Sequence, residues 1–112
     1  MNPQEQLRDM KRGLVAAGKE SPKFMAAFNR LDGTAYADGA LSRKHKELMA
    51  VAISVATRCS YCIAYHVEHC YELGATRDEI LEAAQMGVVF GGSPALAYMG
   101  GVLIPALDEF ED

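Results

Sequence analysis

The sequence lacks an excess of basic residues. It contains 11 lysines and arginines against 15 aspartates and glutamates, which gives a formal net charge of −4 at pH 7. This charge does not attract a phosphate backbone, so nucleic acid is not an expected partner. Alternating patterns of β-branched residues are also scarce, which predicts an all-α fold. Hydrophobic residues make up 50% of the chain and charged residues 23%, a balance typical of a globular domain.

An apolar leader is missing as well. Residues 1–10 contain neither a hydrophobic core segment nor a small-residue cleavage site, so we expect a cytoplasmic protein without a signal peptide or an anchor. The chain has only 3 cysteines, an odd number that favours redox or metal-binding thiols over a structural disulfide framework. No Gly-rich dinucleotide fingerprint and no flavin motif is visible, and we therefore predict no bound cofactor.

Charge is absent from one long stretch, between Glu82 and Asp108. Its length would suit a membrane span, but Gly-Gly-Ser-Pro at 91–94 interrupts it, so we predict two shorter helices and no membrane span. An uncharged stretch of this length is more than one small core needs, which indicates packing between subunits. The 112 residues have room for a single domain, 1–112, and no second core.

Turn and cap residues divide the chain into a bundle of about six helices. The first is expected over 3–17, with apolar residues at spacings of three and four and Gly18 at its end. Ser21-Pro22 has the form of a second helix start, with serine as the N-cap and proline in the first turn. Asp32-Gly33 is expected to weaken or end that second helix.

Three further helix starts follow. Ser42 is expected to cap a helix whose uncharged run, 48–57, predicts that it is largely surrounded by protein. The next helix is predicted from residue 59 or 60 to residue 73, with Gly74 as its C-terminal glycine. Thr76 and Glu79 then have the spacing of a capping box, and the last helix follows Ser-Pro at 93–94.

The segment from Cys59 to His66 has the most chemical information. It has the form Cys-x-x-Cys-x-x-x-His and lies where a helix begins. Thiols in a first helical turn are exposed to the positive end of the helix dipole, which favours the thiolate. At about 100° per residue, Cys59, Cys62 and His66 fall within about one 60° sector of the helix. His66 is therefore placed to accept or return a thiol proton.

Glu47 lies on the preceding helix, at the border between charged first turns and the apolar run. If the two helices pack antiparallel, Glu47 lies level with 66–70, within reach of an imidazole. This geometry leaves two candidate partners, His66 and His69. His45, among basic neighbours, is expected to be solvated, whereas Cys70 is too far along the axis to pair with Cys62 and is expected to pack in the core.

The pattern Glu-x11-Cys-x2-Cys-x3-His, at Glu47, Cys59, Cys62 and His66, resembles the signature of the alkylhydroperoxidase D-like members of the carboxymuconolactone decarboxylase family. The sequence on either side of this motif supports the resemblance, which covers roughly residues 41–98. A Cys-x-x-Cys alone would be a weak signal, whereas four chemically matched positions on two helices are specific.

The resemblance implies a helical homo-oligomer, a trimer or hexamer, that reduces hydroperoxides or exchanges disulfides. On this pattern Cys62 reacts with the peroxide, Cys59 is the resolving thiol, and His66 and Glu47 form a proton relay. An external dithiol protein would supply the electrons. The best-studied type often has histidine before the second cysteine; Tyr61 stands there in this chain and is a poor base near neutral pH, since the free pKa of tyrosine is about 10.

Other readings of the same residues remain. Cys59, Cys62 and His66, with Glu47, could instead form a mixed zinc site, although structural zinc sites usually draw on two separated knuckles. In that case the protein would be a non-catalytic oligomeric helical module that binds metal or senses oxidation. Lactone decarboxylation is a further reading that follows only from the family's name and leaves the cysteines without a role.

Overall fold

The protein is built from helices alone over the part of the chain that the structure describes, residues 2–112 of a computed structural model. The elements are α1 (Pro3–Glu20), α2 (Pro22–Tyr36), α3 (Arg43–Ala56), α4 (Ser60–Glu72), α5 (Arg77–Gly91), α6 (Ser93–Tyr98), the π-helical segment η1 (Met99–Leu103) and α7 (Ile104–Phe110). Because α6, η1 and α7 follow one another without a break, the chain forms six helical rods, which agrees with the predicted all-α bundle.

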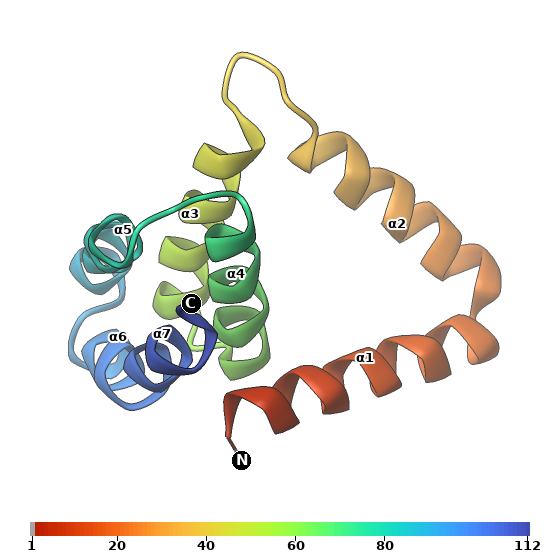
Figure 1. The fold of residues 1–112 in the computed structure, drawn as a ribbon. Coiled ribbons are helices and arrows are strands. Elements are labelled where there is room, and N and C mark those ends of the chain that lie inside the picture. Colours follow the sequence, from red (N-terminus) through yellow and green to blue (C-terminus); the bar gives the residue numbers. More distant parts are fainter. Residues whose placement is uncertain (1) are drawn as a thin grey trace.

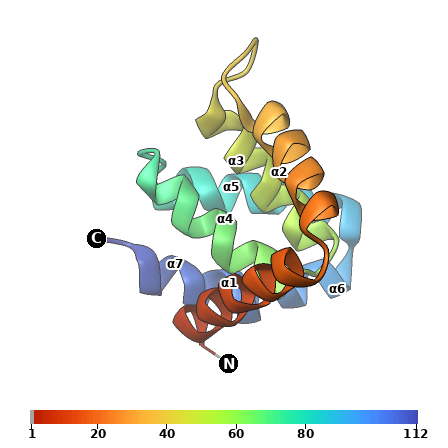
Figure 2. The same cartoon turned by 90° about the vertical axis from the view of Figure 1, so that its right-hand side faces the viewer.

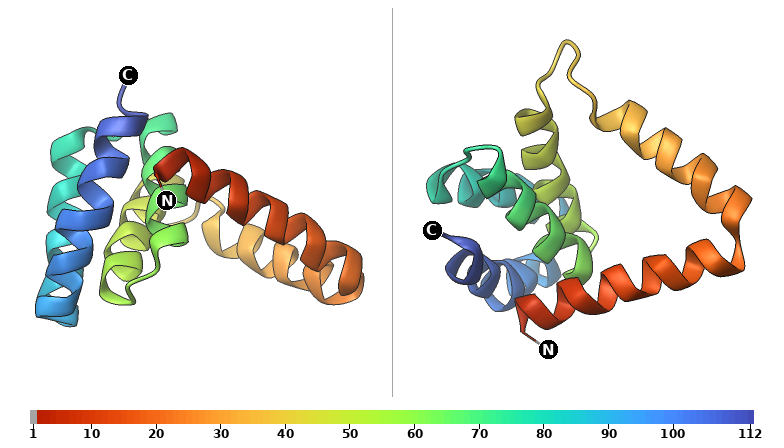
Figure 3. Two further views of the ribbon diagram at one scale, coloured as in Figure 1. Left: turned by 90° about the horizontal axis from the view of Figure 1, so that it is seen from below. Right: turned by 45° about the vertical axis from the view of Figure 1, so that its right-hand side comes forward.

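Two helices stand apart from the rest. Figure 1 shows a body made of α3 to α7, from which α1 projects outward while α2 returns toward the start of α3. Turned views confirm that α1 and α2 extend together from one side of the body (Figures 2 and 3). We call this pair of helices, 3–36, the arm.

Both helices of the arm end later in the sequence than predicted. The first helix runs on to Glu20 and is not ended by Gly18, because the stop comes from Ser21-Pro22, where the second helix begins as predicted. The second helix also continues through Asp32-Gly33 to Tyr36. No residue of α2 is buried, and its apolar side chains Phe24, Phe28 and Leu31 are exposed.

The centre of the body is the antiparallel pair of α3 and α4 (Figure 1). Ser42 caps α3 as predicted, since its side chain accepts a hydrogen bond from the His45 backbone N–H at 3.1 Å. One face of α3 is buried, but Met49 and Ile53 on the other face are 50% and 60% exposed. The prediction that the apolar run of this helix is largely surrounded by protein is therefore wrong for the single chain.

Helix α5 packs against α3 with almost no side chain between them. A Cβ atom at Gly87 would run into the backbone oxygen of Ala52, and one at Gly91 would crowd Ala56 and Ala95. The predicted capping box at the start of α5 is present, with Thr76 and Glu79 bonded reciprocally. This close approach fixes the position of α3, the helix that carries Glu47.

The long uncharged stretch folds into the end of α5 and the last rod. Gly92 has a φ of 73°, a left-handed conformation that glycine adopts without strain, and the chain turns there into α6. Within residues 2–112, no helix is both long and apolar enough to cross a membrane. The core gathers side chains from every helix of the body; its largest fully buried members are Ile63, Ile80, Leu103, Leu107, Val51, Val55 and Val67.

Candidate active site

The two motif cysteines are joined by a disulfide at the start of α4. Cys59 is the N-cap of the helix, and its sulfur accepts a hydrogen bond from the Cys62 backbone N–H at 3.1 Å. The Cα atoms lie 5.2 Å apart, and both residues are partly exposed. A residue in the left-handed region, Arg58 with a φ of 57°, forms the turn that brings Cys59 back against the end of α3. The predicted helix start thus places both sulfurs at the positive end of the α4 dipole.

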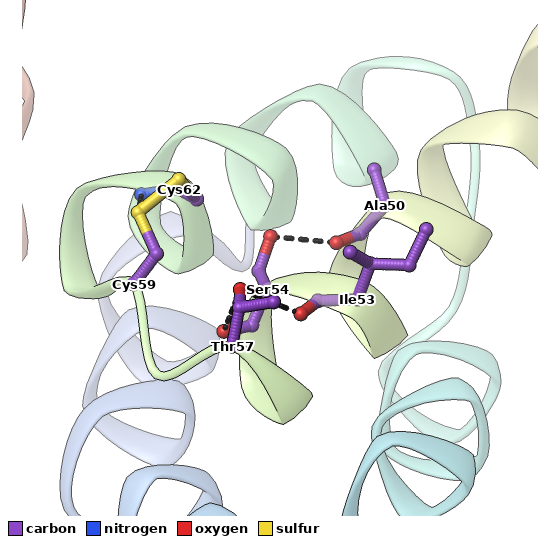
Figure 4. The surroundings of a disulfide bond; sticks show 6 residues. All are labelled: Ala50, Ile53, Ser54, Thr57, Cys59 and Cys62. Carbon is purple, nitrogen blue, oxygen red and sulfur yellow. Dashed lines mark hydrogen bonds between the residues drawn. A yellow bond between two sulfur atoms is a disulfide. The ribbon is translucent and has the colours of Figure 1, made fainter. Parts of the chain in front are cut away.

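Two hydroxyls near the disulfide, at the end of α3, are engaged elsewhere. Figure 4 shows Ser54 and Thr57 directed at carbonyl groups of their own helix. Ser54 donates to the Ala50 carbonyl at 2.6 Å, and Thr57 donates to the Ile53 carbonyl at 2.8 Å. Neither hydroxyl therefore competes for the role of proton donor to a cysteine.

A carboxylate–imidazole pair lies between α3 and α4. Glu47 Oε2 and His66 Nδ1 are 2.6 Å apart, and the two side chains are 1% and 14% exposed. The structure therefore selects His66 over His69 as the partner of Glu47. If the Nδ1–H donates to the carboxylate, the other ring nitrogen, Nε2, keeps its lone pair and can accept a proton.

The second carboxylate oxygen faces an arginine. Arg43, one turn before Glu47 on α3, places Nη2 3.7 Å from Glu47 Oε1. Its side chain is 47% exposed, so the pair is only partly shielded from water. A nearly buried glutamate thus has a different cationic or proton-donating group at each oxygen.

Two tyrosines enclose the imidazole. The ring of Tyr36, the last residue of α2, stacks on His66 with a centroid distance of 5.8 Å and an angle of 20° between the planes, and Tyr65 meets His66 edge-on at 5.1 Å. Burial and then the Glu47 carboxylate raise the pKa of Tyr36 to about 12, and the same two causes raise the pKa of Tyr65. Both phenols therefore keep their protons at neutral pH.

The other histidines take different positions. His69 is half-buried, with Nδ1 2.9 Å from the Tyr65 carbonyl and its ring centroid 4.1 Å from that of Tyr65. His45 is exposed at the start of α3, as expected, with Nδ1 2.9 Å from the Ser42 hydroxyl. Neither contacts Glu47 in the way His66 does.

Tyr61, which stands between the cysteines, points away from the body's interior. Its hydroxyl donates to Asp9 of α1 at 2.6 Å, and this hydrogen bond raises the pKa of Tyr61. Tyr61 thus attaches the arm to the cysteine-bearing helix. Its proton is held by a carboxylate, which leaves it a poor base.

The third cysteine is separate from this chemistry. Cys70 is free and fully buried, as expected for a core residue. Burial raises the pKa of its thiol to about 12, with Glu47 as the next cause. Among residues 2–112, no three histidine, cysteine, aspartate or glutamate side chains are grouped so that they could hold a metal ion.

Sequence reasoning predicts the four motif positions but misses the residues around them. Arg43 could be found from its spacing to Glu47, since residues four apart share a helix face. Tyr65 adjoins His66 in the sequence. No pattern marks Tyr36, because its contact with His66 depends on how the arm returns to the body.

Comparison with known proteins places this geometry in a family. Residues 22–103 match the carboxymuconolactone decarboxylase family. A crystal structure of a member of that family from Legionella pneumophila, in its apo form, superposes with a TM-score of 0.91 at 39% identity, over 98% of this chain and 97% of that one. A Thermotoga maritima member, described as possibly involved in antioxidative response, gives 0.82 at 32% identity, over 92% and 87%.

A relative known from sequence has the same extent. An uncharacterized protein of Cupriavidus necator is 32% identical over 97 residues, which are 87% of this chain and 86% of the relative. The chain belongs to the carboxymuconolactone decarboxylase family, which includes decarboxylases and alkylhydroperoxidases. Its alkylhydroperoxidase D-like character, inferred above from four residues, fits this membership.

Proposed function

We propose that the protein is a thiol-dependent peroxidase or disulfide oxidoreductase of the alkylhydroperoxidase D-like kind. The observation that carries the proposal is the Cys59–Cys62 disulfide at the N-terminus of the helix that also presents His66 to the buried Glu47. A redox pair and an oriented proton acceptor on one helix are the parts that thiol oxidation needs. The decarboxylation after which the family is named would leave both features unused.

The first step consumes the hydroperoxide. In the reduced enzyme the Cys62 thiolate attacks the terminal peroxide oxygen, the O–O bond breaks, and the leaving alkoxide takes a proton and departs as an alcohol. Cys62 becomes a sulfenic acid and is thereby oxidised by two electrons. The positive end of the helix dipole favours the attacking thiolate.

The second step forms the disulfide. The Cys59 sulfur attacks the sulfenic sulfur of Cys62, an S–S bond forms, and hydroxide leaves and is protonated to water. In this proposal His66 accepts the thiol proton on Nε2 and returns it to the leaving oxygen. Glu47 holds Nδ1–H and stabilises the imidazolium that forms transiently.

An external dithiol protein completes the cycle. Its two thiols become a disulfide while Cys59 and Cys62 return to the reduced form, so the electrons and both protons come from this partner. Such partners work in reducing compartments, which favours a cytoplasmic location for the reaction. A disulfide in place of the peroxide would run the same exchange without the sulfenic acid.

We also propose a homo-oligomer, a trimer or hexamer, as the working form. Phe24, Phe28 and Leu31 of α2 are exposed, and so are Met49, Ile53, Met86 and Phe90 on the outer face of α3 and α5. The four exposed residues of α3 and α5 line an apolar pocket of about 370 Å³. Exposed apolar surface of this extent is typical of contacts between subunits.

The deciding experiment counts thiols. The reduced, metal-stripped protein is treated briefly with one equivalent of hydrogen peroxide or tert-butyl hydroperoxide, and peptides are mapped by mass spectrometry. Loss of two hydrogens located at Cys59 and Cys62 is expected. In Cys59→Ser the oxidation should stop at a sulfenic acid on Cys62, which dimedone traps, and Cys70→Ala should behave as the wild type. Unreactive thiols would refute the proposal and favour a non-catalytic module.

A further inference from the structure

The arm has one contact with the carboxylate–imidazole pair. Although α2 buries no residue completely, its last residue, Tyr36, is half-buried and stacks on His66. The helix ends there, and the chain turns away through an extended Ala37. Tyr36 is therefore the point at which α2 reaches the site.

The Tyr36 ring contacts both Arg43 and His66. The Arg43 guanidinium lies over the Tyr36 ring, 5.9 Å from its centroid, and the same guanidinium faces Glu47. The Tyr36 ring in turn covers a face of His66, while Tyr65 meets that ring at 85°. Tyr36 thus lies in a closed cycle of contacts that also includes Arg43, Glu47 and His66.

This cycle restricts the imidazole. A 2.6 Å bond from Nδ1 to Glu47 requires the ring to keep one orientation about its Cβ–Cγ bond. An aromatic ring nearly parallel to it blocks rotation out of that plane. Within residues 2–112, the Tyr36 hydroxyl makes no hydrogen bond to another side chain. The contact with His66 is therefore made by the aromatic ring of Tyr36.

We propose that Tyr36 is a positioning residue: its ring holds His66 in the orientation that bonds Glu47 and leaves Nε2 facing the proton to be transferred. The effect on the oxidation rate rests on the proposed function, whereas the effect on the orientation of the His66 imidazole does not. Both effects come from the aromatic ring of Tyr36 and not from its hydroxyl group.

The test compares three variants of the full chain. Tyr36→Phe keeps the ring, Tyr36→Leu removes it while keeping an apolar side chain, and Phe28→Leu removes an exposed ring from the same helix as a matched control. Two quantities are measured: the NMR shifts of the His66 ring protons, assigned with a His66→Gln variant, and the rate of Cys59–Cys62 oxidation by hydrogen peroxide.

Stacked rings shift each other's proton resonances. We expect Tyr36→Leu to move the His66 resonances and to slow oxidation about tenfold, a part of what general acid–base catalysis contributes. Tyr36→Phe and Phe28→Leu should stay within about twofold of the wild-type rate. Unchanged His66 resonances in Tyr36→Leu would overturn the proposal, as would a Tyr36→Phe variant as slow as Tyr36→Leu. The two proposals can fail separately. If the wild-type thiols do not react with peroxide but the His66 resonances still shift in Tyr36→Leu, the proposed function is refuted and the contact between Tyr36 and His66 is not.

Discussion

Glu47 is a carboxylate that almost no water reaches, bonded on one oxygen by His66 and faced on the other by Arg43. A buried charge of this kind is costly unless its partners compensate for the lost hydration. Among the described residues, no buried side-chain nitrogen or oxygen lacks a hydrogen-bond partner. Glu47 is therefore buried with a partner at each of its two oxygens.

Glu47→Gln should slow oxidation of the reduced cysteines by about 10-fold to 100-fold, because an amide can hold the His66 ring but cannot stabilise the imidazolium. Stopped-flow measurement of the reaction with hydrogen peroxide would show this. Thermal unfolding of the same variant separates a loss of relay from a loss of fold. Full turnover in Glu47→Gln would contradict the relay.

Cys70 should be inert where the other two cysteines react. With a pKa of about 12, only about one thiol in a thousand is ionised at pH 9, whereas an ordinary thiol is roughly half ionised there. After reduction, iodoacetamide at pH 7 to 9 should label Cys59 and Cys62 and leave Cys70 unlabelled until the protein is unfolded. Peptide mass mapping with and without denaturant gives the answer, and rapid native labelling of Cys70 would disprove it.

At the scale of elements, the contact between α3 and α5 determines where Glu47 lies. These helices approach so closely at Gly87 and Gly91 that backbone meets backbone. Glycine in a helix interior has an entropic cost, which the close approach offsets here. α4 and the last rod complete the core.

Gly87→Ala should destabilise the protein by about 2 kcal/mol, because the added methyl group forces α5 away from the Ala52 carbonyl. Gly13→Ala is the matched control, since a Cβ at Gly13 in α1 meets nothing within 4 Å and alanine favours the helix. Urea denaturation of both variants measures the difference. A Gly87→Ala variant as stable as Gly13→Ala would mean that the two helices can separate at little cost.

How far the sequence predicts these elements depends on how local each signal is. The starts at Ser42, Cys59 and Thr76 are correct, because an N-cap is decided within a few residues. The end of α1 is wrong, since Gly18 in a helix costs little when a proline stop follows soon after. Glu47 and its distance to the histidines follow from antiparallel packing, whereas the choice of His66 needs the actual rotation of the helices.

At the scale of the whole molecule, the arm is the part that sequence reasoning could not place. An apolar stripe at Phe24, Phe28 and Leu31 predicts burial but not against what. In the single chain these residues remain exposed, as do Met86 and Phe90 on the body. The same absence of local information explains why no sequence pattern marks Tyr36 as a neighbour of His66.

Replacing Phe28 and Leu31 together by aspartate should disperse the proposed assembly, because two charges cannot be buried in an apolar contact without a partner. Light scattering coupled to gel filtration should give the mass of three or six chains for the wild type and a smaller mass for the variant. Circular dichroism checks that the helices persist. A wild type that is monomeric at every concentration would rule out the assembly.

Each of the two helices of the arm is attached to α4. Asp9 of α1 bonds Tyr61, and Tyr36 of α2 stacks on His66, so both attachments lie on α4, on either side of Cys62. A segment fixed at two points does not swing about a single hinge as a free terminus would. A force applied to the outer corner of the arm, near Ser21, is therefore transmitted to α4 at two sites, one on each side of Cys62.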